Sequence, residues 1–136
     1  MVRVPENIDL LEYLKKYAEE KDVRTGWINV IGSLIDPIIG YYSVSRKGYQ
    51  QIRLKGFYEL VSATGNISLK QGEPFIHLHV ALGDEKGHLH GGHLLYGKVF
   101  IAEAMIIETR GGEPIERILG ERGLWLWETP EQVNNR

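Results

Sequence analysis

Residues 74–97 read PFIHLHVALGDEKGHLHGGHLLYG, and this stretch contains all five histidines of the 136-residue chain. Successive side chains of a β-strand point to opposite faces, so His77 and His79 share one face with Phe75 and Ala81. The opposite face is apolar throughout and consists of Ile76, Leu78, Val80 and Leu82. The stretch therefore predicts a strand with one face in the core and two neighbouring imidazoles on the other.

The segment GDEKG that follows predicts a tight turn into a second strand. We expect residues 84–86 to form a three-residue loop, so that Gly83 pairs with Gly87. His77 then faces His93 across the hairpin, and three imidazoles lie together on one face.

Under the same register, His88 and His90 face Leu82 and Val80 on the opposite side. A slip of one residue, or a bulge at the glycine pair 91–92, would reverse the two faces. We assign His88 and His90 mainly to ordinary polar residues of an exposed strand, and their roles stay open.

His77, His79 and His93 are therefore the predicted ligands of a divalent metal. The chain contains no cysteine, so a metal must bind to nitrogen and oxygen atoms. Three imidazoles with an open fourth position suit zinc best, followed by nickel, cobalt or iron. The alternative is that these histidines are polar residues on an exposed strand face.

Two glutamates could complete such a site. Glu103 lies in the run VFIAEAMII, on the alternating face that also carries Val99, Ile101, Met105 and Ile107. A carboxylate there is costly without a partner, so Glu103 could orient a ligand histidine or supply the fourth ligand. Glu59 is a second candidate for the same roles. Equally, Glu103 could reach solvent or pair with a lysine.

The remaining sequence predicts an α+β fold. Apolar residues at helical spacing predict an amphipathic helix from about residue 8 to 20. From Trp27 onward, runs rich in β-branched and aromatic residues are broken by glycine or proline, which predicts a mainly antiparallel sheet packed with that helix. We expect one domain over residues 1–136, with a core from about 5 to 120 and a frayed tail over 129–136.

The overall charge is small, at −2 with a pI near 6.2, and gives no global attraction to nucleic acid. No stretch approaches the roughly 20 apolar residues that a membrane-spanning helix needs. We therefore expect a cytoplasmic protein with no membrane partner.

Three stretches resemble the plant and prokaryote conserved (PPC) domain family, in its free-standing prokaryotic form. WINVIGSLIDPIIGYY is similar to the family's early glycine-containing strands, GFYELVSATGNIS to its second region, and HLHVALGDEKGHLHGGHL to its HxH and GGHL signature. The resemblance covers nearly all of residues 5–120. Phe57 stands where plant members have arginine.

The resemblance implies an α+β domain that assembles as a homotrimer, with metal-type histidines at His77, His79 and His93. Plant members join this domain to an AT-hook that binds DNA. This chain has no such hook: its nearest string, RGGEP at residues 110–114, keeps one arginine and is expected to be a turn.

The leading functional hypothesis is a trimeric binding or regulatory protein with a zinc-type metal, acting on a protein partner or a small ligand. A second hypothesis is DNA binding through a surface patch made of Lys15, Lys16, Arg46, Lys47, Arg53 and Lys55. A third is a metal-dependent hydrolase or lyase in which Glu59, Glu103 or Asp84 acts as general base. The sequence neither supports nor excludes catalysis. Trp125 and Trp127 alternate onto one face, which suits a contact between subunits.

Overall fold

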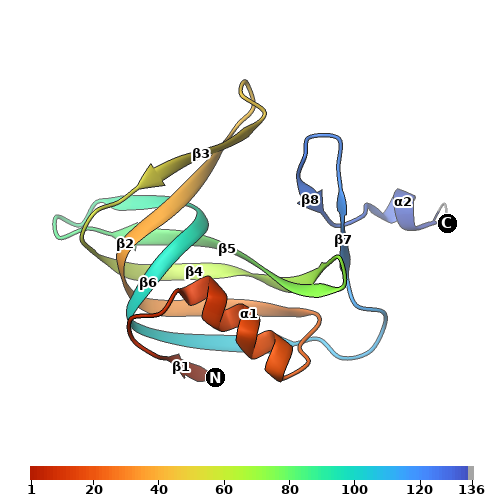
Figure 1. Ribbon diagram of the computed structural model, residues 1–136, viewed down its shortest axis with the longest axis horizontal. Helices are drawn as coiled ribbons and strands as arrows, with labels where there is room; N and C mark the ends of the chain where they lie inside the picture. Colours follow the sequence, from red (N-terminus) through yellow and green to blue (C-terminus); the bar gives the residue numbers. More distant parts are fainter. Residues whose placement is uncertain (135–136) are drawn as a thin grey trace.

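The computed structural model describes residues 1–134, and a ring of four long β-strands lies at its centre (Figure 1). In chain order the elements are β1 (Val2–Val4), α1 (Leu10–Glu20), β2 (Gly26–Ser43), β3 (Gly48–Arg53), β4 (Phe57–Lys70), β5 (Glu73–Gly83), β6 (Leu89–Glu108), β7 (Glu116–Leu119), β8 (Trp125–Leu126) and α2 (Pro130–Asn134). β2 pairs with β4 and β6, and β5 pairs with the same two strands, all antiparallel. The expected mainly antiparallel sheet with an N-terminal helix is confirmed.

The core lies inside this ring and under α1, which contacts β5 and β6. It is made of one apolar face from each strand together with the buried face of the helix. Among its fully buried side chains are Leu10, Leu14, Ile28, Leu34, Leu60, Ile67, Leu78, Leu82 and Leu94. As predicted, the even-numbered residues of β5 from 76 to 82 are buried, which turns His77 and His79 to the outside.

The N-terminus of α1 is fixed by Asp9. Its Oδ1 accepts a hydrogen bond from the backbone N–H of Glu12 at 2.9 Å, the usual interaction of a helix N-cap. Its Oδ2 accepts one from the N–H of Gly97 on β6 at 2.8 Å. One carboxylate therefore both begins the helix and attaches it to the sheet, within two residues of the predicted start.

Three features of the strands differ from the sequence prediction. β2 runs without a break through Asp36 and Pro37, where two separate strands were expected, because Asp36 adopts a positive φ of 49° and forms two hydrogen bonds with Gly56. The short strands β1 and β7 were not predicted, since three or four residues carry too little periodicity.

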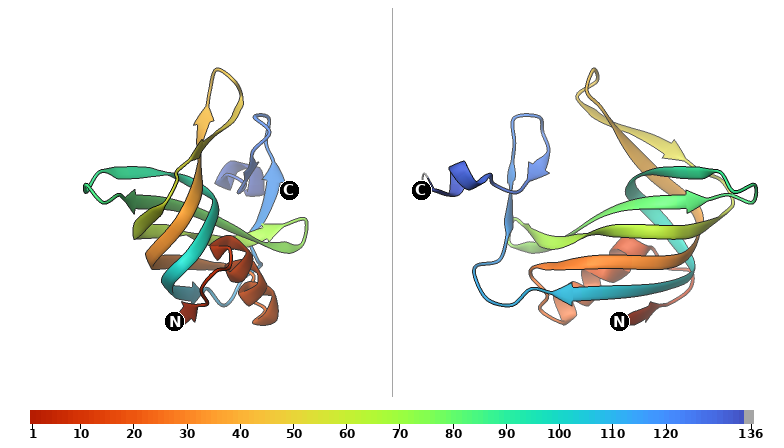
Figure 2. Two further views of the ribbon diagram at one scale, coloured as in Figure 1. Left: turned by 60° about the vertical axis from the view of Figure 1, so that its left-hand side comes forward. Right: turned by 180° about the vertical axis from the view of Figure 1, so that it is seen from behind.

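The C-terminal elements β7, β8 and α2 stand beside the ring rather than in it (Figure 1 and Figure 2). β7 joins the sheet through a short parallel pairing with the end of β4, where Lys70 is opposite Arg117. The predicted tail over residues 129–136 contains the helix α2, and its last two residues lie outside the described part of the chain. None of the helices within residues 1–134 is long and apolar enough to cross a bilayer.

Gly65 allows β4 and β5 to approach closely beside His77. A Cβ atom at this position would collide with the carbonyl oxygen of His77 and lie 2.9 Å from the Cα of Leu78. We expect Gly65→Ala to lower the free energy of unfolding by about 1–3 kcal/mol, because the backbone cannot move away cheaply. Chemical denaturation of Gly65→Ala and of Gly48→Ala, whose Cβ would meet only one atom at 3.9 Å, measures the difference. Equal stability of the two variants would contradict this account.

Candidate metal centre

Three histidines converge on the outer face of the sheet, where β5 meets β6. Each of His77, His79 and His93 offers a ring nitrogen, and these three atoms lie within 4.8 Å of one another. The Nε2 atoms of His77 and His79 are 3.2 Å apart. The structure thus brings together the three residues that the sequence predicted to lie together.

The register of this hairpin differs from the prediction by two residues. His79, not His77, is opposite His93, and Gly83 pairs with Leu89 rather than with Gly87. The loop is longer than expected because the Asp84 carboxylate accepts hydrogen bonds from the N–H groups of Lys86 and His88, both at 2.9 Å. A shift of two residues leaves every side chain on its predicted face, so the three histidines still lie together although the predicted register was wrong.

The donor set fits a metal ion. The Nδ1 atom of His93 is buried and has no hydrogen-bond partner among the described residues. Its ring lies 5.1 Å from the Tyr49 ring on one side and 4.9 Å from the His77 ring on another. A buried nitrogen without a partner costs free energy, and a cation that binds to this group would remove part of that cost.

The surroundings lower the pKa values of two of these imidazoles, those of His77 and His93. The pKa of His77 is lowered to about 4, chiefly by burial and then by the positive charges of His93, Arg117 and His79. The pKa of His93 is also lowered to about 4, by burial first and then by His79 and Arg117. A neutral imidazole has a free lone pair at pH 7, which is the form that binds a metal.

Arg117 is the residue that the sequence analysis missed. Its guanidinium donates hydrogen bonds to Ser68 Oγ and to Asn66 Oδ1, both at 2.7 Å, and to the carbonyl oxygen of Trp125 at 2.9 Å. The same group lies 3.4 Å from Nδ1 of His77. The parallel pairing of β7 with β4 places it there, and no periodicity in residues 111–120 predicts that pairing.

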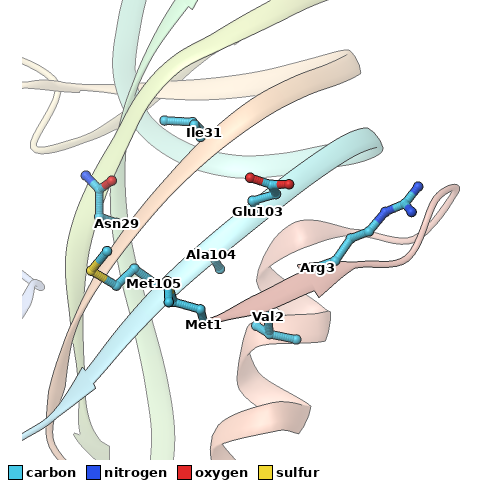
Figure 3. A pocket seen from close by; sticks show the side chains of 8 residues that line it. All are labelled: Met1, Val2, Arg3, Asn29, Ile31, Glu103, Ala104 and Met105. Carbon is cyan, nitrogen blue, oxygen red and sulfur yellow. The ribbon is translucent and has the colours of Figure 1, made fainter.

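The two candidate glutamates lie elsewhere in the protomer. Glu103 is opposite Arg3 in the pairing of β1 with β6 and lines a hollow near the N-terminus (Figure 3). Val99 is buried whereas Glu103 is exposed, because a bulge at Phe100 reverses the faces of β6 between them. Glu59 is opposite Gly83, at the far end of β5. Neither carboxylate belongs to the three-histidine group, and a role for either stays a prediction.

The other two histidines form a separate cluster with Asp84. His88 Nδ1 and His90 Nε2 lie 3.2 Å and 3.3 Å from Asp84 Oδ2. Partial burial would raise the pKa of the Asp84 carboxyl, but hydrogen bonds from His88, His90 and Lys86 hold it well below its usual range. His90 is opposite Leu82, not Val80 as expected, and His88 lies in the turn. This cluster stabilises the loop.

Sequence and structure comparisons gave matches along most of the chain. The family model of the Plants and Prokaryotes Conserved (PCC) domain matches residues 1–110. A solved plant- and prokaryote-conserved (PPC) protein from Pyrococcus horikoshii is 50% identical with a TM-score of 0.91, covering 94% of this chain and 89% of that one. A metal-containing protein from Archaeoglobus fulgidus is 36% identical with a TM-score of 0.88, covering 94% and 91%.

A candidate DNA-binding protein from Ralstonia eutropha JMP134 is 23% identical with a TM-score of 0.84, covering 95% of this chain and 90% of that one. At this identity the likeness shows the fold alone. No curated protein matched the sequence.

The lowered pKa values of His77 and His93 predict that the metal-free protein is less stable in mild acid. Between pH 6.5 and about 4 the unfolded chain binds more protons than the folded chain, so the free energy of unfolding falls as the pH is lowered. Urea denaturation of chelator-treated protein at pH 7 and pH 5 should give a lower midpoint at pH 5. The His77→Gln/His93→Gln double variant should lose most of this dependence, and His88→Gln should keep it. A dependence of the same size in the double variant would contradict the assignment.

Proposed function

This chain belongs to the Plants and Prokaryotes Conserved domain family, and from that premise we propose that it is a homotrimeric binding or regulatory protein with a zinc ion held by His77, His79 and His93. The observation that carries the proposal is the convergence of three ring nitrogens within 4.8 Å. All three come from the paired strands β5 and β6, and their ring nitrogens are already close enough for a metal to bind without rearrangement of the backbone.

Zinc suits this donor set better than the hard cations do. Three imidazoles leave one position of a tetrahedral zinc ion open, whereas magnesium and calcium require oxygen ligands. The related protein from Archaeoglobus fulgidus contains a metal, which supports the presence of one here. When bound, zinc would supply a Lewis acid whose open position receives a ligand.

A binding role agrees with the surroundings of the histidines better than a catalytic one. A hydrolytic metal site needs a general base within hydrogen-bond reach of the metal-bound water. Glu59 and Glu103, two of the three candidate general bases, belong to other parts of the sheet. The Asp84 carboxylate lies within hydrogen-bond distance of the His88 and His90 rings, in a cluster separate from the three histidines. Ligand capture without turnover is therefore the proposed activity.

DNA binding is the weaker proposal. Of the six basic residues considered, Lys15 and Lys16 form ion pairs with Glu19 and Glu20 along α1. Of the other four, Arg46 and Lys47 lie in the turn before β3, Arg53 is its last residue and Lys55 follows it; Figure 1 shows β3 away from α1. Divided in this way, the six charges form no single patch.

The outer apolar face supports assembly of the trimer. This face comprises Trp27, Ile31, Ile101, Met105 and Ile107, each between 45% and 53% exposed. These residues share one face of the paired strands β2 and β6, on the side away from the core. Asn29 and Glu103 lie on the same face between these residues. So many exposed large apolar side chains on one face are uncommon on a monomer, and contact between subunits would remove them from water.

The metal prediction is tested by elemental analysis of tag-free protein. We expect close to one zinc per chain in the wild type and at least a tenfold loss of zinc affinity in His77→Ala, His79→Ala and His93→Ala, because two imidazoles bind much more weakly than three. His88→Ala, which removes an exposed histidine from the neighbouring turn, is the matched control and should keep its metal. A wild type without metal would overturn the proposal.

The assembly prediction is tested by light scattering coupled to gel filtration. We expect the wild type to have the mass of three chains, and Ile31→Glu to dissociate it, because a buried unpaired carboxylate in each interface is costly. Val44→Glu places the same charge on the turn after β2, where the side chain is 81% exposed, and should leave the trimer intact. A monomeric wild type at high protein concentration would contradict the assembly.

A further inference from the structure

Arg117 is a buried cation without an anionic partner in the described part of the chain. The residue is only 5% exposed, and no carboxylate within residues 1–134 forms an ion pair with it. Its hydrogen bonds go to neutral atoms of Ser68, Asn66 and Trp125. Burial of a charge is costly unless an opposite charge compensates it, and this burial lowers the pKa of Arg117. Within residues 1–134, the positive charge of Arg117 is therefore not compensated by a carboxylate.

The three-histidine site increases this excess of positive charge. Arg117 Nη2 lies 3.4 Å from Nδ1 of His77, and His77 presents its other nitrogen, Nε2, to His79. A divalent cation at the site and the Arg117 guanidinium would together contribute a formal charge of about +3 to this region. In a partly buried place such a charge attracts anions strongly.

The guanidinium also has donors to spare. It carries five N–H groups, of which the Nε group and one Nη1 group donate to Ser68 and Trp125. One Nη2 group donates to Asn66 and the other lies 3.4 Å from His77, so a second Nη1 group remains. A neutral His77 that binds a metal through Nε2 keeps its proton on Nδ1 and cannot accept from Arg117. Metal binding would thus release one more donor.

We propose that Arg117 and the three-histidine site together bind a small carboxylate-bearing ligand, an inference that rests on the proposed zinc site. The ligand carboxylate accepts hydrogen bonds from the guanidinium, which matches its planar geometry, and its charge is further stabilised by the metal. The rings of Phe75 and Trp127 lie 5.0 Å and 5.6 Å from the guanidinium carbon. This aromatic lining favours an organic carboxylate over inorganic phosphate.

The test uses zinc-loaded full-length protein, with zinc content measured on the same sample. The chain has three tryptophans, and the indole N–H signal of Trp127 reports on ligands near Arg117 in a ¹⁵N NMR titration. At constant ionic strength, acetate should shift this signal, whereas its neutral analogue acetamide should not. Arg117→Met should weaken acetate binding at least about tenfold, the usual effect of losing a charge-assisted hydrogen bond, and Arg117→Lys should restore part of it.

Two control variants separate this site from general effects. Lys70→Met removes the neighbouring cation, which lies over the Phe75 and Trp125 rings, and should change acetate affinity by less than about threefold if the guanidinium itself is the receptor. Ser68→Ala removes the hydrogen bond from Arg117 Nε to Ser68 Oγ but keeps the guanidinium. Acetate should therefore still bind to this variant.

Each contrary result has a definite meaning. Zinc-free wild type would overturn the proposed function itself. Zinc-loaded wild type that does not respond to acetate, or an Arg117→Met variant that binds acetate as tightly as wild type, would overturn the present inference alone. A loss of acetate affinity in Lys70→Met as large as that in Arg117→Met would also overturn the inference, because it would show that acetate is attracted by positive charge in general. Tighter binding of inorganic phosphate than of acetate would overturn the assignment to a carboxylate.

Discussion

Burial of one face of β5 determines where the site lies. Ile76, Leu78, Val80 and Leu82 enter the core, and a strand alternates its side chains, so the residues between them must leave it. His77 and His79 are thus fixed on the outside by apolar side chains that never touch a ligand. The hydrophobic free energy of those four side chains, at about 1.5–3 kcal/mol each, exceeds anything that the imidazoles could gain by turning inward.

The same constraint explains why an incorrect register still gave the correct group of histidines. Any pairing of β5 with β6 that keeps both apolar faces in the core must differ from the true one by an even number of residues. The predicted loop was two residues too short. The Asp84 carboxylate accepts hydrogen bonds from N–H groups of this loop and thereby stabilises the longer form. The hydrophobic pattern determines which face of the strand a side chain occupies. The register of the two strands depends on the hydrogen bonds of the turn, which a single sequence indicates poorly.

Contacts that join distant parts of the chain were beyond prediction. Arg117 reaches His77 across forty residues of sequence, through a parallel pairing of only two residue pairs between β4 and β7. Glu103 illustrates the opposite failure, since it was nominated by its neighbours in sequence and lies beside Arg3 instead. A bulge at Phe100 changes the face of β6, and a bulge leaves no mark in the alternation of such an apolar strand.

The site has an uncommon balance of charge. Metal-binding histidines usually donate their second N–H to a carboxylate or a carbonyl group, which increases their basicity and partly neutralises the metal. Here the group next to Nδ1 of His77 is the guanidinium of Arg117, which cannot accept that N–H and adds positive charge. A metal held in this way would be a stronger electrophile and would bind its own ligands more weakly. With the proposed metal bound, such a centre would gain most from an anion, because the anion would compensate both cations at once, and this is the reason for proposing a receptor for anionic ligands rather than a purely structural metal.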